Sequence, residues 1–444
     1  MKILQIGEGN FLRAFAEDYI QKANEKGFIA AEVVICQPRS NTRVIDALKA
    51  QGNEYNIMLS GRFNGEVVDE TKKITCVSAC LDTQSEYDKI EALFCSKDLK
   101  IVLSNTTEAG ICFDENEKQG DIPNKNVPAR ITNLLYKRFK AGVSGLVFLP
   151  VELIEDNAIT LKKYIIDYAK LWRFDNDFIS YVENECSFCN TLVDRIVSGH
   201  KAGDSDACSV SAEPYASWII QADERCKEVF PLDGFDGIVF ADDLAAYRTR
   251  KVRILNGTHT MSVLAAYMSG IDIVRDMMND EVFAKYIELG LEEIKQTINL
   301  PKEELDSFAN SVMERFNNPF IDHKLFDISL NSMAKFNTRC LPSILDYMII
   351  NGKAPKVLSF AFAALIAFYL REGTDREYTP NDSETVMDLY GNIGCNPVME
   401  ILSDSELWGE DLTKKDMLYN AVFDSFESIK NNGIINAVKE VVNG

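Results

Sequence analysis

Short apolar runs alternate with longer helical patterns over the first half of the chain. Continuous apolar runs separated by helical segments are typical of parallel strands that are covered on both faces. The runs lie at residues 3–6, 33–36, 101–104 and 146–149. After the first run, Phe11, Phe15, Tyr19 and Ala23 recur every four residues, which predicts an amphipathic helix that ends near Gly27. This half therefore has the pattern of a Rossmann-type, doubly wound α/β sheet.

The pattern changes near residue 244, where helical periodicity begins to dominate. Helices are predicted at 258–269, 281–298, 303–316, 341–350, 356–371, 383–391 and 414–440. The apolar stretch 357–370 is shorter than the roughly 20 residues that span a bilayer, so it predicts a buried helix. A turn-rich segment at 60–65 predicts an inserted antiparallel hairpin. We expect an α/β domain over residues 1–243 and a mainly α-helical domain over 244–444.

A glycine-rich turn follows the first predicted strand. Gly7 and Gly9 lie where a dinucleotide site needs glycines, because a Cβ at either position would keep the backbone away from a pyrophosphate. Leu12 stands where the usual third small residue would be. Asn10, Phe11 and Arg13 complete the candidate cofactor residues of this turn. Arg13 either reaches a phosphate or is a solvated helix charge.

Two later strand ends add candidate cofactor residues. The acidic residue that usually binds the adenosine ribose is absent after the second run, where Gln37 and Arg39 stand instead. Gln37 is suited to a ribose hydroxyl and Arg39 to a 2′-phosphate, so these residues leave the choice between NAD and NADP open. Asn105 and Thr106 follow the third run, at the strand edge where open α/β sheets bind ligands, although a plain polar loop is an equal alternative.

The most informative polar segment of the second half contains Lys251, Asn256 and His259. In a regular α-helix these residues lie at about 0°, 140° and 80° around the axis, on one broad side. Reduction of a ketone needs a proton donor and hydrogen bonds to the negative charge that develops on oxygen. Arg250 and Arg253, as like-charged neighbours, would favour the neutral form of Lys251. The spacing alone favours a simpler interpretation, a basic helical turn with one satisfied histidine.

Charge limits the partners that the protein can bind. The chain has 47 Lys and Arg against 68 Asp and Glu, a net charge of −21, which repels nucleic acid and anionic membranes. A small anionic substrate would need local positive charge, which the sequence offers at Arg248, Arg250, Lys251 and Arg253 and again at Lys324, Lys335 and Arg339. We expect a small-molecule substrate and a monomer or small homo-oligomer.

The cysteines and the N-terminus indicate a cytoplasmic protein. Eleven cysteines without a regular framework predict reduced thiols, and no secretory signal pattern precedes Gly7. Cys186 and Cys189 form a C-x-x-C pair, but no second pair or histidine pair completes a metal site. The sequence also lacks a P-loop and a G-x-S-x-G motif, which argues against kinases and serine hydrolases of those kinds.

Several segments together resemble one family. Residues 7–15 (GEGNFLRAF) are similar to the G-x-G-x-F-x-R-A opening of the mannitol dehydrogenase family, which comprises polyol-specific long-chain dehydrogenases. Lys251, Asn256 and His259 match the K-x4-N-x2-H active-site motif of that family. Other similar segments follow in family order at 105–110 (NTTEAG), 190–196 (NTLVDRI), 315–323 (RFNNPFIDH) and 327–342.

The resemblance implies an NAD-linked, metal-independent oxidoreductase. The opening, NTTEAG and KVRILNGTHT look most like the family members that reduce a keto-uronate, tagaturonate, to the aldonate altronate. Fructuronate, mannitol or mannitol 1-phosphate are the alternative substrates, and a non-catalytic NAD-binding sensor is the alternative outside this class. By position, Lys251 is implied to be the general acid/base, Asn256 an oxyanion partner and His259 a substrate ligand. Asp194 and Lys335 are implied to line the substrate site.

The sequence departs from the family at one point. Mannitol-type members have a second oxyanion asparagine in a C-D-N segment after the last main strand, where this chain reads PVELIEDN at 150–157. Glu152 and Asn157 are both candidates for that position. The departure argues against mannitol as the substrate.

Overall fold

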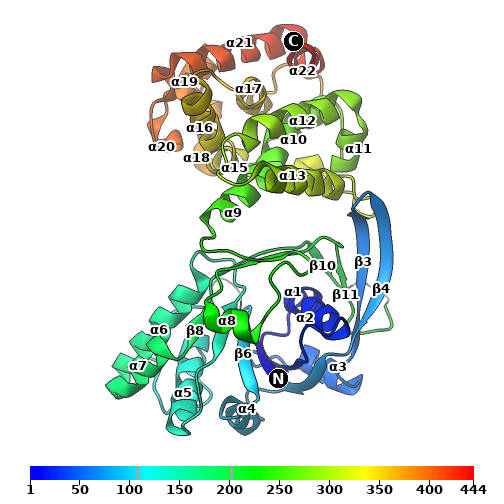
Figure 1. Cartoon of the computed structure of the whole chain (residues 1–444). Coiled ribbons are helices and arrows are strands. Elements are labelled where there is room, and N and C mark those ends of the chain that lie inside the picture. Colours follow the sequence, from blue (N-terminus) through cyan, green and yellow to red (C-terminus); the bar gives the residue numbers. More distant parts are fainter. Residues whose placement is uncertain (107–109, 201–203) are drawn as a thin grey trace. The chain divides into compact units, whose positions relative to one another are not determined.

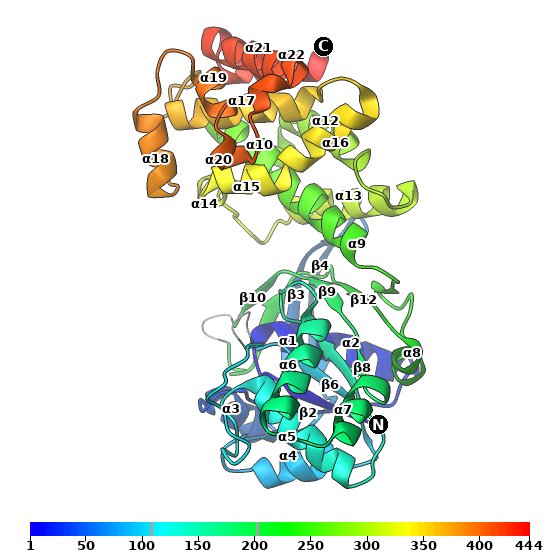
Figure 2. The ribbon, with the colours of Figure 1, turned by 90° about the vertical axis from the view of Figure 1, so that its left-hand side faces the viewer.

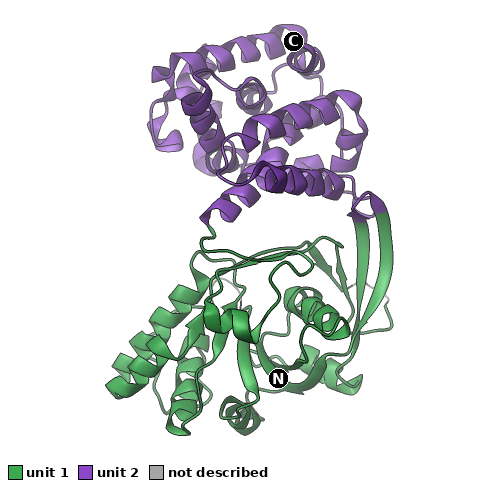
Figure 3. Cartoon of the chain, in the orientation of Figure 1, with its two compact units in different colours: residues 1–61, 67–244 green, residues 62–66, 245–444 purple. Residues whose placement is uncertain are grey.

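The computed structural model describes residues 1–106, 110–200 and 204–444, which group into two compact units. Unit 1 comprises residues 1–61 and 67–244, and unit 2 comprises residues 62–66 and 245–444 (Figure 3). Each unit is described separately. Thr107, Glu108 and Ala109 of the NTTEAG segment lie outside the described residues.

Unit 1 contains three sheets and the helices that cover them (Figure 1). Its strands are β1 (Lys2–Ile6), β2 (Glu32–Cys36), β3 (Tyr55–Phe63), β4 (Glu66–Ile74), β5 (Val77–Leu81), β6 (Leu99–Ser104), β7 (Val147–Pro150), β8 (Ser187–Phe188), β9 (Thr191–Asp194), β10 (Val197–Gly199), β11 (Val210–Ala212), β12 (Ser217–Ile220) and β13 (Ile238–Phe240). Its helices are α1 (Asn10–Ala14), α2 (Ala16–Glu25), α3 (Arg43–Ala50), α4 (Tyr87–Phe94), α5 (Val127–Lys140), α6 (Asn157–Leu171), α7 (Asn176–Asn184) and α8 (Glu224–Val229).

The main sheet is parallel throughout, in the order β5-β2-β1-β6-β7-β8. Successive residues of each strand face opposite sides, so Ile3 and Val33 belong to one buried cluster and Leu4 and Val34 to the other. Helices α4 to α7 supply the second cluster, and Figure 1 shows α5, α6 and α7 together on that side of the sheet. The four predicted strands and the doubly covered sheet are confirmed. The strand order reverses between β1 and β6, which places a ligand crevice at their carboxyl ends.

The predicted first helix is divided in two at Phe15. Phe15 has φ −124° and ψ −77°, outside the helical region. The carbonyl groups released at the break accept hydrogen bonds from side chains: Tyr55 Oη donates to Arg13 O at 2.6 Å and Arg195 Nη1 donates to Ala14 O at 2.6 Å. These donors come from distant segments, so the local pattern could not predict the break.

The hairpin predicted at 60–65 is present as β3 and β4. Its tight turn uses Asn64 and Gly65, both with positive φ, the conformation that two-residue hairpin loops require. The tip, residues 62–66, belongs to unit 2. There the carboxylate of Glu314 accepts the backbone N–H groups of Asn64 at 2.9 Å and Gly65 at 2.6 Å.

Apart from the hairpin tip at residues 62–66, unit 2 is mainly helical (Figure 2). Its helices are α9 (Ala245–Arg250), the π-helix η1 (Lys251–Asn256), α10 (Gly257–Met268), α11 (Val274–Asn279), α12 (Glu281–Lys295), α13 (Lys302–Phe316), α14 (Leu325–Ile328), α15 (Ser332–Arg339), α16 (Leu341–Asn351), α17 (Lys356–Leu370), α18 (Glu384–Gly391), α19 (Pro397–Leu402), α20 (Ser405–Trp408), the 3-10 helix η2 (Leu412–Lys414), α21 (Asp416–Asn432) and α22 (Ile434–Asn443).

Helix α17 forms the centre of unit 2. Nearly all its residues are buried, and it packs against α10, α12 and α21. Although α17 is the most apolar helix, neither it nor any other helix among the described residues is long and apolar enough to cross a membrane. The single helix predicted at 414–440 is wrong: Gly433, with φ 78°, separates α21 from α22.

Candidate active site

Gly7 lies at the carboxyl end of β1 and could not carry a side chain. Its φ of 128° is disfavoured for other residues, and a Cβ would lie 2.8 Å from the backbone oxygen of Asn105, which follows β6. The loop after β1 and the loop after β6 therefore touch at this glycine. This close approach forms the floor of the crevice at the point where the strand order reverses.

Gly9 has the opposite surroundings. A Cβ there would have no heavy atom within 4 Å, and no side chain caps the N-terminus of α1. Asn10 is exposed and Phe11 is partly buried against Phe15, with ring centroids 4.9 Å apart. The open space beside uncapped backbone N–H groups fits the pyrophosphate of a dinucleotide.

Arg13 is not the solvated helix charge that the sequence allowed. Its side chain is buried, and the guanidinium donates to Glu8 O at 3.0 Å, to Asn10 Oδ1 at 2.7 Å and to Cys208 O. These bonds hold the glycine-rich loop from behind. Direct contact of Arg13 with a phosphate remains a prediction, whereas its support of the loop is visible in these contacts.

A buried polar network beneath the loop was not anticipated from the sequence. Gln5 Nε2 donates to Gly7 O at 2.9 Å and to Glu17 Oε1 at 2.8 Å, and Tyr55 Oη donates to Glu17 Oε2 at 2.7 Å. Burial raises the pKa of the Glu17 carboxyl, against the effect of these hydrogen bonds. A polar Gln5 inside the apolar β1 run was the only signal for this network.

Gln37 bonds to an acid of the neighbouring strand end. Its side chain is fully buried and donates to Asp82 Oδ1 at 2.6 Å, just beyond β5. Its amide nitrogen is therefore bonded within the protein, and its role toward a ribose hydroxyl stays a prediction. Asp82 also accepts donors from Gln84 and Ser85.

Arg39 instead lines a pocket of about 310 Å³ between the segments that follow β2 and β6. Other residues that line it are Thr106, Cys112, Lys125 and Asn126. The acids Asp114 and Glu117 line it as well, so the pocket carries both positive and negative charges. In an open α/β sheet this is the position for the adenosine half of a dinucleotide.

Asn105, Thr106 and Glu152 join the ends of β6 and β7. Asn105 Nδ2 donates to Val151 O at 3.1 Å, and Glu152 Oε1 accepts the backbone N–H of Thr106 at 3.0 Å. Ser104 Oγ donates to the other Glu152 oxygen at 3.0 Å. Burial raises the pKa of the Glu152 carboxyl, which these donors partly offset.

Asn157 cannot act as the second oxyanion donor that the sequence suggested. It is buried, its Nδ2 donates to Glu152 O at 3.1 Å and to Thr191 O at 3.2 Å, and its Oδ1 accepts the Thr191 N–H at 3.1 Å. Its amide donors are used by the backbone. Leu153, which follows Glu152, is 65% exposed.

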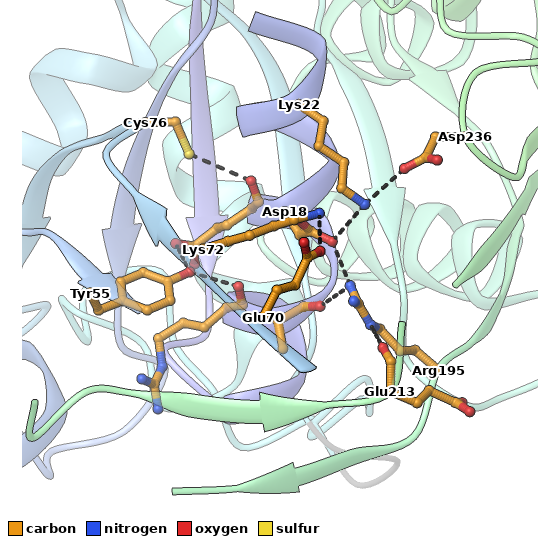
Figure 4. A network of polar contacts seen from close by, with 12 residues as sticks. Asp18, Lys22, Tyr55, Glu70, Lys72, Cys76, Arg195, Glu213 and Asp236 are labelled. Carbon is orange, nitrogen blue, oxygen red and sulfur yellow. Dashed lines mark hydrogen bonds and ion pairs between the residues drawn. The ribbon is translucent and has the colours of Figure 1, made fainter. Parts of the chain in front are cut away.

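Asp194 ends β9 and is buried. The next residue, Arg195, forms a buried ion pair with Asp18 at 2.7 Å, and Lys22 contacts the same carboxylate at 3.0 Å (Figure 4). Burial alone would raise the pKa of Asp18, but the two cations hold it below its ordinary value. The ion pair fixes the chain beside Asp194 to α2.

In unit 2 the segment predicted as a regular helix contains one turn of π-helix, η1. The backbone N–H of Gly257 bonds to Val252 O, five residues earlier. In this geometry residues five apart lie about one turn apart, so Lys251 and Asn256 fall on one side instead of 140° apart. His259 follows Asn256 by three residues at the start of α10, which keeps it on the same side.

Gly257 allows another helix to approach this turn. A Cβ at Gly257 would lie 3.2 Å from the backbone oxygen of Arg339, and Cys340 Sγ donates to Gly257 O at 3.6 Å. Arg339 Nη1 lies 3.5 Å from Thr260 Oγ1, the residue after His259. The end of α15 is thus held beside the N-terminal turn of α10, together with Lys335 one turn earlier on α15.

His259 is the most perturbed group of this site. Its ring stacks on Phe316 with centroids 3.9 Å apart, and its inaccessible Nε2 has no hydrogen-bond partner in the described structure. Burial, together with the charges of neighbouring cationic or titratable groups, lowers the pKa of His259 to about 3. Those groups are His323, Arg315, Arg339 and Lys335. A neutral histidine with an unmatched nitrogen is suited to a substrate hydroxyl.

The two arginines that flank Lys251 contact acids on other helices. Arg253 Nη1 pairs with Asp346 at 2.6 Å and donates to Thr297 O at 2.9 Å. Arg250 lies 3.6 Å from Glu304 and over the ring of Phe308. Their charges are partly neutralised by these acids, because the helical turn directs both side chains toward other helices.

Comparison with known proteins covers both units. Residues 1–234 match the mannitol dehydrogenase Rossmann domain, and residues 243–430 match the mannitol dehydrogenase C-terminal domain. An altronate oxidoreductase of Bacteroides thetaiotaomicron is 38% identical over 464 aligned positions, which cover 99% of this chain and 97% of that protein. An altronate oxidoreductase of Halalkalibacterium halodurans is 35% identical and covers 100% of this chain and 93% of its own length.

Two solved structures share the fold at lower identity. Pseudomonas fluorescens mannitol 2-dehydrogenase, in a ternary complex with NAD and D-mannitol, has a TM-score of 0.64 at 21% identity, covering 100% of this chain and 94% of its own. A substrate-free D-sorbitol dehydrogenase has a TM-score of 0.79 at 18% identity, covering 98% and 94%. With both domains matched and relatives at 35–38% identity over nearly its full length, the chain belongs to the mannitol dehydrogenase family.

Proposed function

We propose that this protein is an NAD-dependent dehydrogenase that reduces a keto-uronate, tagaturonate, to the aldonate altronate, and that the reaction is reversible. The observation that carries the proposal is the π-helical turn that aligns Lys251 with Asn256 next to the unpartnered nitrogen of His259. The full-length similarity to altronate oxidoreductases supports the choice of substrate. Unit 1 would bind the cofactor, and unit 2 would carry the substrate and the proton chemistry.

The glycine-rich loop fits NAD. Gly7 and Gly9 leave the backbone accessible. The open space beside Gly9 lies where a pyrophosphate would bind. The bound nicotinamide supplies or accepts the hydride. Arg13 and Gln5 hold the loop, while Arg39 is the residue through which NADP would be accommodated.

Three side chains share the work on the substrate. Lys251 donates a proton to the ketone oxygen during reduction and, as a neutral amine, takes the hydroxyl proton in the reverse direction. The Asn256 amide donates a hydrogen bond to the same oxygen, where negative charge develops. His259, held neutral by its surroundings, bonds a second hydroxyl through Nε2 and orients the sugar. Asp194 and Lys335 are assigned as further substrate residues.

A substrate panel tests this proposal. NADH and NADPH consumption is followed with tagaturonate, fructuronate, fructose and fructose 6-phosphate, for wild type, Lys251→Ala and the control Lys302→Gln, which removes an exposed lysine of the same unit. Tagaturonate should be turned over with NADH, and the alanine variant should lose at least about a hundredfold in kcat. No turnover of any ketose would disprove the function, and near-full activity of Lys251→Ala would disprove the mechanism.

A further inference from the structure

The surroundings of His259 contain an excess of positive charge. Arg315, Lys335 and Arg339 all face the ring closely enough to disfavour its protonation. Burial lowers the pKa of Lys335, and its neighbour Arg339 lowers it further. In a protein of net charge −21, this is a local concentration of cations around one helical turn.

Several buried or half-buried cations of this chain have a carboxylate partner, and others, such as Arg138, donate to several backbone carbonyl groups. Arg195 pairs with Asp18, Arg253 with Asp346 and Arg376 with Asp272. Within residues 1–106, 110–200 and 204–444, by contrast, no carboxylate lies within ion-pairing distance of Lys335 or Arg339.

Their hydrogen bonds leave the charges uncompensated as well. Lys335 Nζ donates to Ile328 O at 2.9 Å, and Arg339 makes one long contact of 3.5 Å with Thr260 Oγ1. Asp382, whose charge is felt at Lys335, accepts Tyr369 Oη and the N–H of Met333 instead. Two half-buried cations without a counter-ion cost folding free energy unless an anion binds between them.

Arg339 lies close to the residues that follow Asn256 and His259 in the sequence. Its backbone oxygen lies against Gly257, which directly follows Asn256, and its guanidinium lies at Thr260, which directly follows His259. A keto-uronate carries its carboxylate at the end of the carbon chain away from the ketone. With the ketone at Lys251 and Asn256 and a hydroxyl at His259, the carboxylate is directed past Thr260.

We infer that the guanidinium of Arg339, with Lys335 beside it, binds the substrate carboxylate and thereby selects sugar acids over neutral ketoses. This inference rests on the proposed function. Guanidinium and carboxylate form two parallel hydrogen bonds, which an ammonium group does not reproduce, so arginine is suited to the role. A phosphate ester offers similar chemistry, so the test includes one.

The test compares Arg339→Gln and Arg339→Lys with wild type and with the control Lys302→Gln. NADH oxidation is measured with tagaturonate, fructose and fructose 6-phosphate, and binding of altronate to the NADH complex is measured by calorimetry. Arg339→Gln should raise the KM for tagaturonate about tenfold or more with little change in kcat, because the lost contact is equal in ground and transition states. The Kd of altronate should rise by a similar factor, and Arg339→Lys should recover part of both.

Unchanged KM and altronate Kd in Arg339→Gln would overturn the inference, as would a loss confined to kcat, which would indicate a positioning role. A loss seen only with fructose 6-phosphate would assign the anion to a phosphate and overturn the carboxylate. The wild-type measurements alone decide the proposed function, whereas the ratio of variant to wild type decides the role of Arg339. Melting curves of both substitutions exclude misfolding as the cause.

Discussion

His259 lies between an aromatic ring and a group of cations, and these surroundings determine its charge. Stacking on Phe316 removes water from the ring, and nearby Arg315, Lys335 and Arg339 oppose a further positive charge. A catalytic histidine often acts as a proton donor near neutral pH. Here the same side chain is kept as a neutral hydrogen-bonding group, which agrees with the proposal that Lys251 transfers the proton.

The ionisation of His259 can be observed directly because the chain has only three histidines. With ring-labelled histidine, the His259 resonance should not shift between pH 8 and pH 5, since burial and the nearby cations hold its pKa at about 3. The unfolded chain binds this proton near pH 6.5, so stability falls as the pH drops below that value. The exposed His200 serves as the internal comparison. A His259 resonance that shifts with a midpoint between pH 6 and 7 would contradict the conclusion that this ring is held neutral.

Gly9 provides a test of the cofactor loop that leaves the fold intact. Because no heavy atom lies within 4 Å of a Cβ at this position, Gly9→Val should fold normally but place its methyl groups in the space assigned to the pyrophosphate. The Kd for NADH, measured by fluorescence titration, should rise about tenfold or more. Gly120→Val is the matched control, because a Cβ there also meets nothing within 4 Å. Equal affinities of both variants would argue against this loop as the cofactor site.

At the scale of elements, the π-helical turn explains why the asparagine lies five positions after the lysine. Regular α-helical spacing would rotate Asn256 by about 140° from Lys251, whereas the wider turn realigns them. A π-turn is equivalent to one extra residue in an α-helix. The chain reaches the same alignment that residues four apart would have in a regular helix.

This equivalence predicts an unusual mutational result. Deletion of Val252 should restore a regular helix with the lysine four residues before the asparagine and retain substantial activity. Moving the lysine by one position, in the double variant Lys251→Ala/Val252→Lys, should abolish activity because the π-turn then directs the amine elsewhere. Steady-state kinetics and circular dichroism of both variants decide the matter. An inactive but well-folded deletion variant, or an active double variant, would show that the π-helical turn is not what aligns the lysine with the asparagine.

Elements with local sequence signals were predictable, whereas features that depend on distant contacts were not. Apolar runs predicted four strands of the main sheet and, with the glycines, its ligand-binding edge, because these signals are local. The π-turn was not predictable, since a single inserted residue barely disturbs an apolar period. The burial of Gln37 depends on Asp82, which is 45 residues away and on another strand. Among the described residues, Arg339 has no carboxylate nearby because of the way the chain folds, and this could not be predicted from residue spacing in the sequence.

At the scale of the whole molecule, the charge of −21 has a thermodynamic effect. Many ion pairs among the described residues have at least one exposed partner, such as Lys227 with Glu224 and Lys89 with Glu86, and such pairs contribute little to stability. The remaining carboxylates repel one another across the surface. This net repulsion should make the folded state sensitive to ionic strength.

The melting temperature should therefore rise when NaCl is increased from about 0.01 M to about 0.15 M, because the screening length falls from about 30 Å to about 8 Å. Differential scanning calorimetry at pH 7 measures the change. Choline chloride in place of NaCl controls for specific binding of sodium. A melting temperature that falls with added salt would mean that attractive pairs outweigh the repulsion.

The tip of the β3–β4 hairpin affects how the gene can be recombined. Residues 62–66 are separated in sequence from the rest of unit 2 by the whole remainder of unit 1, yet Glu314 caps their turn. A chimera that exchanges only residues 245–444 with a relative would therefore pair one parent's turn with the other parent's cap. Exchanging the short tip together with the C-terminal half keeps turn and cap from the same parent, so two crossover regions are needed where the linear order suggests one.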